Sequence, residues 1–121
     1  SLDSRAVYDP DTATVAVRVP GTPAVLKGAL VHEFAHHLEF QCQEHEDLRP
    51  AFLAALGLPA GTEWRPGNGS ATAPANVYGD IPSEQYAEAA VILVLGRRPV
   101  TTGVRVTDEA VRAVEAWATG K

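Results

Sequence analysis

The sequence is poor in residues that cross-link a chain, cross a membrane or bind nucleic acid. Cys42 is the only cysteine among 121 residues, so no disulfide can form within the chain. The longest apolar run, residues 87–95, is far too short to span a membrane. Arg97-Arg98 is the only basic cluster in a chain of net charge −5. We therefore expect neither a membrane span nor a nucleic-acid partner.

Methionine is absent even at position 1, and no signal peptide is visible. We therefore expect a processed or trimmed product, from which a targeting segment could have been removed. Arginine outnumbers lysine, and alanine, glycine and proline are abundant, which is typical of a bacterium with a GC-rich genome. These features leave the compartment and the oligomeric state open, and an extracytoplasmic location stays one of the options.

The composition predicts one folded domain over residues 1–121. A hydrophobic content of 45% is enough for a core and too high for a disordered chain. The length is that of a single domain.

The most informative motif is His32-Glu33-Phe34-Ala35-His36, which reads H-E-x-x-H. Residues four apart lie on one face of a helix, so both imidazoles can bind one zinc ion. Glu33 points close to the same side, where it can take a proton from an attacking water. The motif therefore predicts His32 and His36 as zinc ligands and Glu33 as a general base. The alternative is a helix that carries the histidine pair by chance.

The motif is expected on a helix from about residue 25 to about residue 46. Phe34, Leu38 and Cys42 recur at i, i+4 and i+8, and this apolar stripe is expected to bury against the core while the histidines face a cleft. Cys42 would then be a buried, inert thiol.

A catalytic zinc ion needs a third protein ligand and one open position. In one large class of zinc peptidases the helix ends at a glycine three residues after the second histidine. Here that position is Glu39, so the helix should continue past it. Cys42 would then lie about 9 Å further along the helix axis, too far to share the metal. His37 is rotated by about 100° from His36 and faces elsewhere, and His45 is further away still. The third ligand is therefore expected from a later element.

A second helix is expected from Ser83 to Leu95, with Ser83 as N-cap and Gly96 as its end. Glu84 lies in its first turn, and Glu88 follows one turn later on the same face. We expect Glu84 to be the third zinc ligand and Glu88 to hold a ligand histidine by its other ring nitrogen. Two alternatives stay open: Glu88 is the ligand, or Glu84 only faces the helix dipole.

These two motifs together resemble the gluzincin metallopeptidases, which share H-E-x-x-H on one helix and a glutamate ligand on the next. The downstream pattern E-x-x-A plus an acidic residue is matched by Glu84, Ala87 and Glu88, although several gluzincin families have Asp at the last position. The resemblance covers only these two short motifs. It implies a small zincin-like α+β domain, a Zn²⁺ cofactor and a peptide or protein substrate.

The remaining elements are expected to be a hairpin, a short helix capped by Asp47 and a final helix, at residues 5–9 with 13–19, 47–56 and 107–119. The resemblance implies that the hairpin, as part of a twisted sheet, packs on the H-E-x-x-H helix. Its second strand could then bind substrate as an added strand. Alternatively, the hairpin only covers the core.

The long irregular stretch from residue 60 to residue 82 is of a kind that is often functional. It carries Tyr78, our first candidate for the donor that stabilises the oxyanion, with Tyr86 and His45 as alternatives. Trp64 either lines the cleft or serves as a hydrophobic plug for this loop.

Three functional classes follow from this sequence. The first is a zinc metallopeptidase. The second is a zincin-like domain that binds zinc for recognition or regulation, with little or no proteolysis. The third is an interaction domain without metal. Glu33 favours the first class over the second, because a purely structural zinc site needs no base.

Overall fold

A computed structural model of the chain describes residues 6–17, 22–65, 80–97 and 103–120. Within these residues the fold is α+β, with a two-stranded antiparallel sheet and four helices. The elements are β1 (Ala6–Asp9), β2 (Thr14–Val17), α1 (Pro23–Gln41), α2 (His45–Ala55), α4 (Pro82–Leu95) and α5 (Asp108–Thr119). None of the described helices combines the length and the apolar character needed to cross a membrane.

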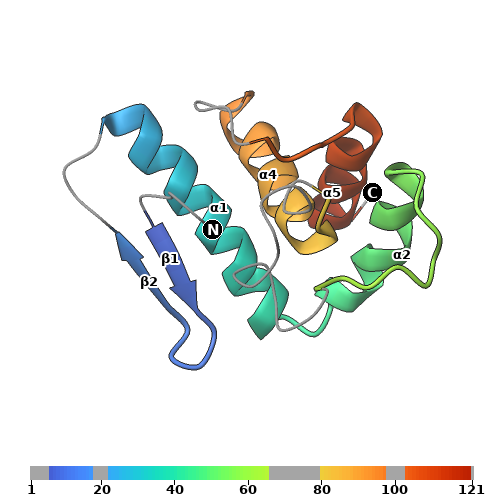
Figure 1. Ribbon diagram of the computed structural model, residues 1–121, viewed down its shortest axis with the longest axis horizontal. Helices are drawn as coiled ribbons and strands as arrows, with labels where there is room; N and C mark the ends of the chain where they lie inside the picture. The colour runs from blue at the N-terminus through green and yellow to red at the C-terminus, as the bar shows by residue number, and fades with distance from the viewer. Residues whose placement is uncertain (1–5, 18–21, 66–79, 98–102, 121) are drawn as a thin grey trace.

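Helix α1 lies between the hairpin and the other helices (Figure 1). The hairpin packs on one side of α1 through both strands, and α4 packs on another side. Helix α5 packs on α4 and on α2. The interface between α1 and α4 therefore runs through the middle of the molecule, and the H-E-x-x-H motif and the Glu84 helix meet there.

The hairpin is confirmed, with a register from Ala6 opposite Val17 to Asp9 opposite Thr14. The Asp9 side chain accepts a hydrogen bond from the backbone N–H of Asp11 at 3.0 Å, which stabilises the turn. Ala13 closes the turn in the left-handed region, at φ 52°. The end of the expected second strand, residues 18 and 19, lies outside the described residues.

Helix α1 begins as its sequence predicts but ends earlier. Thr22 caps it by accepting a hydrogen bond from the backbone N–H of Val25, and Pro23 occupies the first turn. The expectation that it continues to about residue 46 is wrong, because Cys42 adopts an extended conformation at φ −106° and ψ 115°. No glycine or proline marks this end. The bend allows His45 and Leu48 to enter the core on the next helix.

The buried face of α1 is mainly polar, although it also includes Ala29 and Ala35. His32, Glu33, His36 and Glu39 are all at most 6% exposed, whereas Phe34 is 53% exposed. The predicted burial of an apolar stripe is therefore wrong, and Cys42 at its end is only half-buried. Buried polar side chains are tolerated where they are paired or bind metal, and the α1–α4 interface supplies such partners.

Two further helix starts differ from the prediction by one or two residues. Helix α2 begins at His45, and Asp47 lies in its first turn instead of capping it. Helix α4 begins at Pro82 after an Ile81 cap, so Ser83 lies inside the helix and its hydroxyl is used elsewhere. The predicted end of α4 is confirmed, because Gly96 adopts φ 80°, a conformation that favours glycine.

The hydrophobic core lies where α2, α4 and α5 meet. Its largest buried members include Phe52 and Tyr86, which are at most 1% exposed, and Trp64, which is 8% exposed. Ala110 and Val114 contribute the inner face of α5, which is capped by the Thr107 side chain. Trp64 is therefore a packed member of the core at the end of the loop segment that the structure describes.

Candidate metal centre

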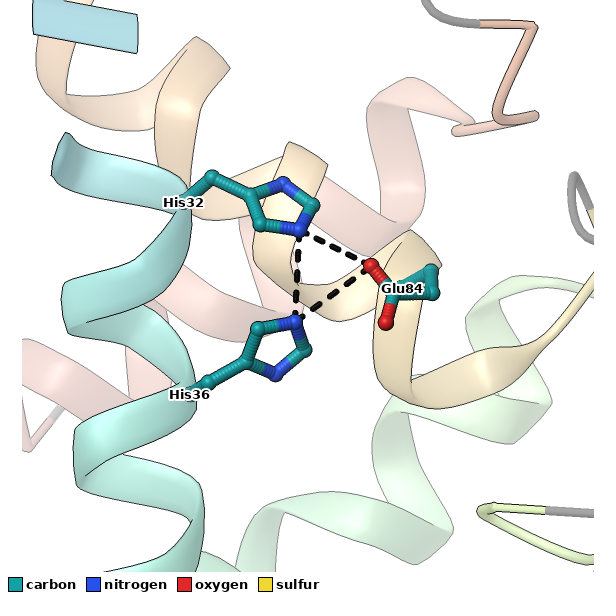
Figure 2. A group of neighbouring side chains, drawn as sticks. All are labelled: His32, His36 and Glu84. Atoms are coloured by element: carbon teal, nitrogen blue, oxygen red, sulfur yellow. Dashed lines mark hydrogen bonds and ion pairs between the residues drawn. The ribbon is translucent and has the colours of Figure 1, made fainter. Parts of the chain in front are cut away.

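Three side chains converge at the α1–α4 interface: His32 and His36 from α1, and Glu84 from the first turn of α4 (Figure 2). The two histidine Nε2 atoms are 3.2 Å apart. Glu84 Oε1 lies 2.8 Å from Nε2 of His32 and 3.3 Å from Nε2 of His36. All three side chains are buried. The helical spacing of four residues therefore places both imidazoles against the one carboxylate.

Each histidine is held from behind by a second carboxylate. The Nδ1–H of His32 donates to Glu88 Oε2 at 2.6 Å, and the Nδ1–H of His36 donates to Glu39 Oε1 at 2.9 Å. A proton kept on Nδ1 leaves the Nε2 lone pair of a neutral imidazole pointing forward. Carboxylates in this position are the usual partners of metal-binding histidines.

The donor set fits a zinc ion. Two imidazole nitrogens and one carboxylate oxygen are the ligands of many catalytic zinc sites. With zinc–ligand bonds of about 2.0–2.1 Å, a tetrahedral site has ligand atoms about 3.3 Å apart. The three separations here, 2.8, 3.2 and 3.3 Å, are close to that value. Three electron-pair donors facing one point would repel one another unless a proton or a metal ion lies among them.

The electrostatics of the cluster also favour a cation. Burial alone lowers the pKa of His36, but hydrogen bonds to Glu39 and Glu84 outweigh it and raise this pKa from 6.5 to about 10. The pKa of His32 is likewise raised, as hydrogen bonds to Glu84 and Glu88 overcome the effect of burial. Burial raises the pKa of Glu84, yet its hydrogen bonds to both histidines bring this pKa well below its usual range. The Glu84 carboxylate therefore stays ionised and attracts positive charge to the two Nε2 positions.

Glu33 lies beside the cluster and contacts the hairpin. Its Oε2 is 3.8 Å from Nε2 of His32, and its Oε1 accepts a hydrogen bond from the backbone N–H of Tyr8 at 3.1 Å. The side chain is 2% exposed. Strand β1 is therefore the strand that contacts the proposed base. The backbone N–H that meets Glu33 belongs to a residue 25 positions earlier, and no local pattern in the sequence reveals this contact.

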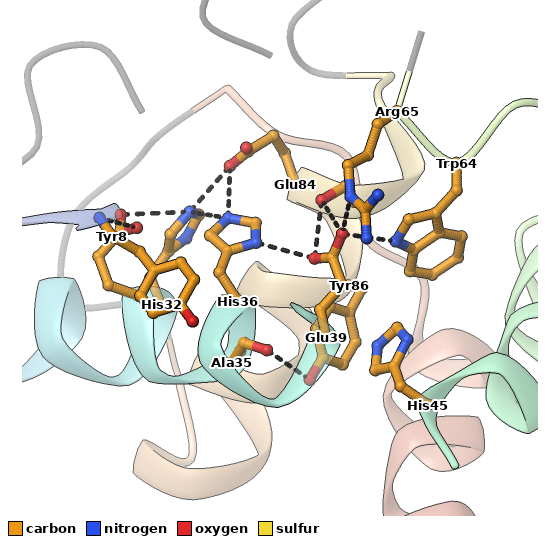
Figure 3. A network of polar contacts seen from close by, with 12 residues as sticks. Tyr8, His32, Ala35, His36, Glu39, His45, Trp64, Arg65, Glu84 and Tyr86 are labelled. Atoms are coloured by element: carbon orange, nitrogen blue, oxygen red, sulfur yellow. Dashed lines mark hydrogen bonds and ion pairs between the residues drawn. The ribbon is translucent and has the colours of Figure 1, made fainter. Parts of the chain in front are cut away.

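Glu39 is the residue that sequence reasoning missed. It stands three residues after His36, and this spacing places it on the same helix face. That spacing was the available signal. Its side chain is fully buried and joins His36 to the loop before α4 (Figure 3).

Of the three candidates for the oxyanion donor, Tyr78 lies outside the described residues. The hydroxyl of Tyr86 donates to the backbone carbonyl of Ala35 at 2.9 Å, so its hydrogen is already used in joining α4 to α1. The ring of His45 packs edge-on against Trp64, Tyr86 and Trp117 in the core. Tyr86 and His45 thus have packing roles that the sequence did not distinguish from catalytic ones.

Tyr86→Phe is expected to lower the free energy of unfolding by about 1 kcal/mol without changing zinc affinity, because it removes one buried hydrogen bond outside the ligand set. Denaturant unfolding and a zinc competition titration on the same preparations measure both quantities. A large loss of zinc affinity would instead assign the hydroxyl to the site.

The burial of His45 is expected to make folding sensitive to acid. Burial lowers the pKa of His45 from 6.5 to about 4 in the folded chain. Between those pH values the unfolded chain binds a proton at His45 that the folded chain does not. His45 therefore has no effect on the free energy of unfolding well above pH 6.5, and it lowers this free energy increasingly as the pH falls toward 4. The expected loss from this residue is at most about 3 kcal/mol.

In metal-free protein, His45→Phe is therefore expected to reduce the slope of unfolding free energy against pH between pH 4 and pH 6.5. Urea unfolding at several pH values measures the slope for both proteins. Because the other titrating groups are shared, equal slopes would mean that His45 does not titrate as described.

Comparisons with family models, with curated proteins and with solved structures find no match to this chain. The function has to be inferred from the site.

Proposed function

We propose that this protein is a zinc-dependent metallopeptidase of the gluzincin type, with a small zincin-like fold. The observation that carries the proposal is the convergence of His32, His36 and Glu84 within hydrogen-bonding distance of one another, with Glu33 beside them. The order of the motifs along the chain and the packing of a β-hairpin on the H-E-x-x-H helix support the same assignment.

In this proposal His32, His36 and Glu84 hold the metal ion, and Glu88 keeps the His32 imidazole in the required orientation. Zinc, when bound, supplies a Lewis acid that polarises a carbonyl group and lowers the pKa of a water molecule. Glu33 takes a proton from the water that attacks the carbonyl carbon. It then gives that proton to the amine nitrogen as the C–N bond breaks. The backbone N–H of Tyr8 holds the Glu33 carboxylate in place for both transfers. Tyr78 is kept as the candidate oxyanion donor.

A second candidate function is favoured by the burial of the site. His32 and His36 are 6% exposed, and Glu33 and Glu84 are 2% exposed. A substrate must reach these groups, so a chain that stays in this closed form would bind zinc without efficient hydrolysis. The alternative is therefore a zincin-like domain that binds zinc and serves recognition or regulation.

The test combines metal analysis with digestion of a peptide library. Protein reconstituted with zinc should contain about one zinc ion per chain and should cleave peptides in a reaction that a chelator stops and added zinc restores. Zinc binding without cleavage would favour the second candidate. A chain that binds no zinc after reconstitution would exclude both.

A further inference from the structure

Glu39 is unusual for a glutamate near the end of a helix, because it is buried and has several side-chain partners. Its side chain is fully buried, although it lies only two residues before the end of α1. Four different side chains contact its two oxygens: His36, Ser83, Trp64 and Arg65.

These contacts join three separate parts of the chain. The Ser83 hydroxyl, from the first turn of α4, lies 2.8 Å from Oε1 and 2.9 Å from Oε2. The Trp64 indole N–H donates to Oε2 at 3.0 Å, and Arg65 forms an ion pair with the same oxygen (Figure 3). The backbone N–H of Ser83 also donates to the Trp64 carbonyl at 3.0 Å, which closes the network around the carboxylate.

With these donors in place, the carboxylate has little freedom to rotate. Oε2 is held by Trp64 and Arg65, and Oε1 is thereby directed at Nδ1 of His36, 2.9 Å away. A charged acceptor in a buried site forms stronger hydrogen bonds than a neutral one. The geometry therefore fixes both the tautomer and the ring orientation of His36.

We propose that Glu39 is a positioning residue for the metal centre, which orients His36 toward the metal and links it to Ser83, Trp64 and Arg65. This inference rests on the metal site of the proposed function but not on peptide hydrolysis. Each ligand histidine then has a carboxylate partner on its Nδ1 atom: Glu88 from α4 for His32, and Glu39 from α1 for His36.

The test is cobalt binding by the full chain, because the visible absorption spectrum of bound Co²⁺ reports the geometry of its ligands. Glu39→Gln has nearly the same size, but its NH₂ group donates where the wild-type oxygens only accept. We expect its cobalt dissociation constant to rise by about 10–100-fold, the range for partners of metal-binding histidines, with an altered spectrum. Glu88→Gln should weaken binding to a similar degree. Glu46→Gln, which removes an exposed carboxylate on α2, is the matched control and should behave as wild type.

A folded Glu39→Gln variant with the wild-type dissociation constant and spectrum overturns the proposal, even if its melting temperature is lower, because that result means a purely structural role. If Glu39→Gln does not fold, Glu39→Asp decides the question. It keeps the charge beside Arg65 but is one methylene shorter, so it should fold, bind cobalt several-fold more weakly and show an altered spectrum. Wild-type binding by that variant would equally overturn the proposal. A wild-type chain that binds no cobalt and no zinc rejects the metal site itself, whereas metal binding without hydrolysis rejects only the peptidase.

Discussion

Glu33→Gln is expected to retain zinc and the fold yet to lose peptide hydrolysis by about 10²–10⁴-fold, the usual contribution of a positioned general base. Glutamine is almost the same size as glutamate and its carbonyl oxygen can still accept the hydrogen bond from the backbone N–H of Tyr8. It cannot take a proton from water as a carboxylate does. The substitution therefore separates the base from the ligands. Rates of cleavage of a selected peptide, zinc content and circular dichroism of the two proteins measure the three effects.

Glu46→Gln is the control, since it makes the same chemical change at an exposed position of α2. It should cleave at the wild-type rate. If Glu33→Gln also cleaves at that rate, Glu33 is not the base and the mechanism proposed above is wrong. If wild type and variant both bind zinc but neither cleaves, the domain is closed or non-catalytic. That result would favour the recognition or regulatory function over the peptidase.

The second large effect concerns the third ligand. Glu84→Gln is expected to weaken zinc binding by more than 100-fold, whereas Glu88→Gln should weaken it by about 10–100-fold. The reason is geometric: Glu84 Oε1 faces both Nε2 atoms, at 2.8 and 3.3 Å, but Glu88 Oε2 lies behind the ring on Nδ1 of His32. Competition with a chromogenic chelator measures both affinities.

His36→Ala is the reference for complete loss of a ligand and should abolish stoichiometric zinc. Glu88→Gln is the matched comparison, because it makes the same change one turn further along α4. Wild-type affinity in Glu84→Gln would remove Glu84 from the ligand set. A larger loss in Glu88→Gln than in Glu84→Gln would exchange the roles assigned to them.

The close approach of α1 and α4 explains why hydrolysis and zinc affinity are both expected to depend on a few residues. Each helix contributes two side chains one turn apart, His32 with His36 and Glu84 with Glu88, to the same buried interface. The Tyr86 hydroxyl joins the helices behind the site through the Ala35 carbonyl. Small shifts between the helices would therefore move the ligand atoms of α1 relative to that of α4.

What the sequence determined by itself was local. The spacing of four between His32 and His36 required only a helix, and α1 supplies it. Gly96 ended α4 at the predicted position, because a left-handed residue after a helix favours glycine. The turn residues between the two strands were sufficient to predict the hairpin. Each of these features depends on side chains within a few positions of one another.

What only the tertiary structure decided depends on residues far apart in the chain. The end of α1 at Cys42 follows from the burial of His45 and Leu48 in the core, not from a helix-breaking residue. The apolar pattern predicted the wrong buried face of α1, because the α1 imidazoles pair there with carboxylates from α4 in place of apolar packing.

Likewise, the Glu33 contact with β1 and the Glu39 contacts with Trp64, Arg65 and Ser83 join segments 25 to 44 positions apart. Helical periodicity indicates which side chains share a face, but the partner of that face is fixed only when all the helices pack around one core.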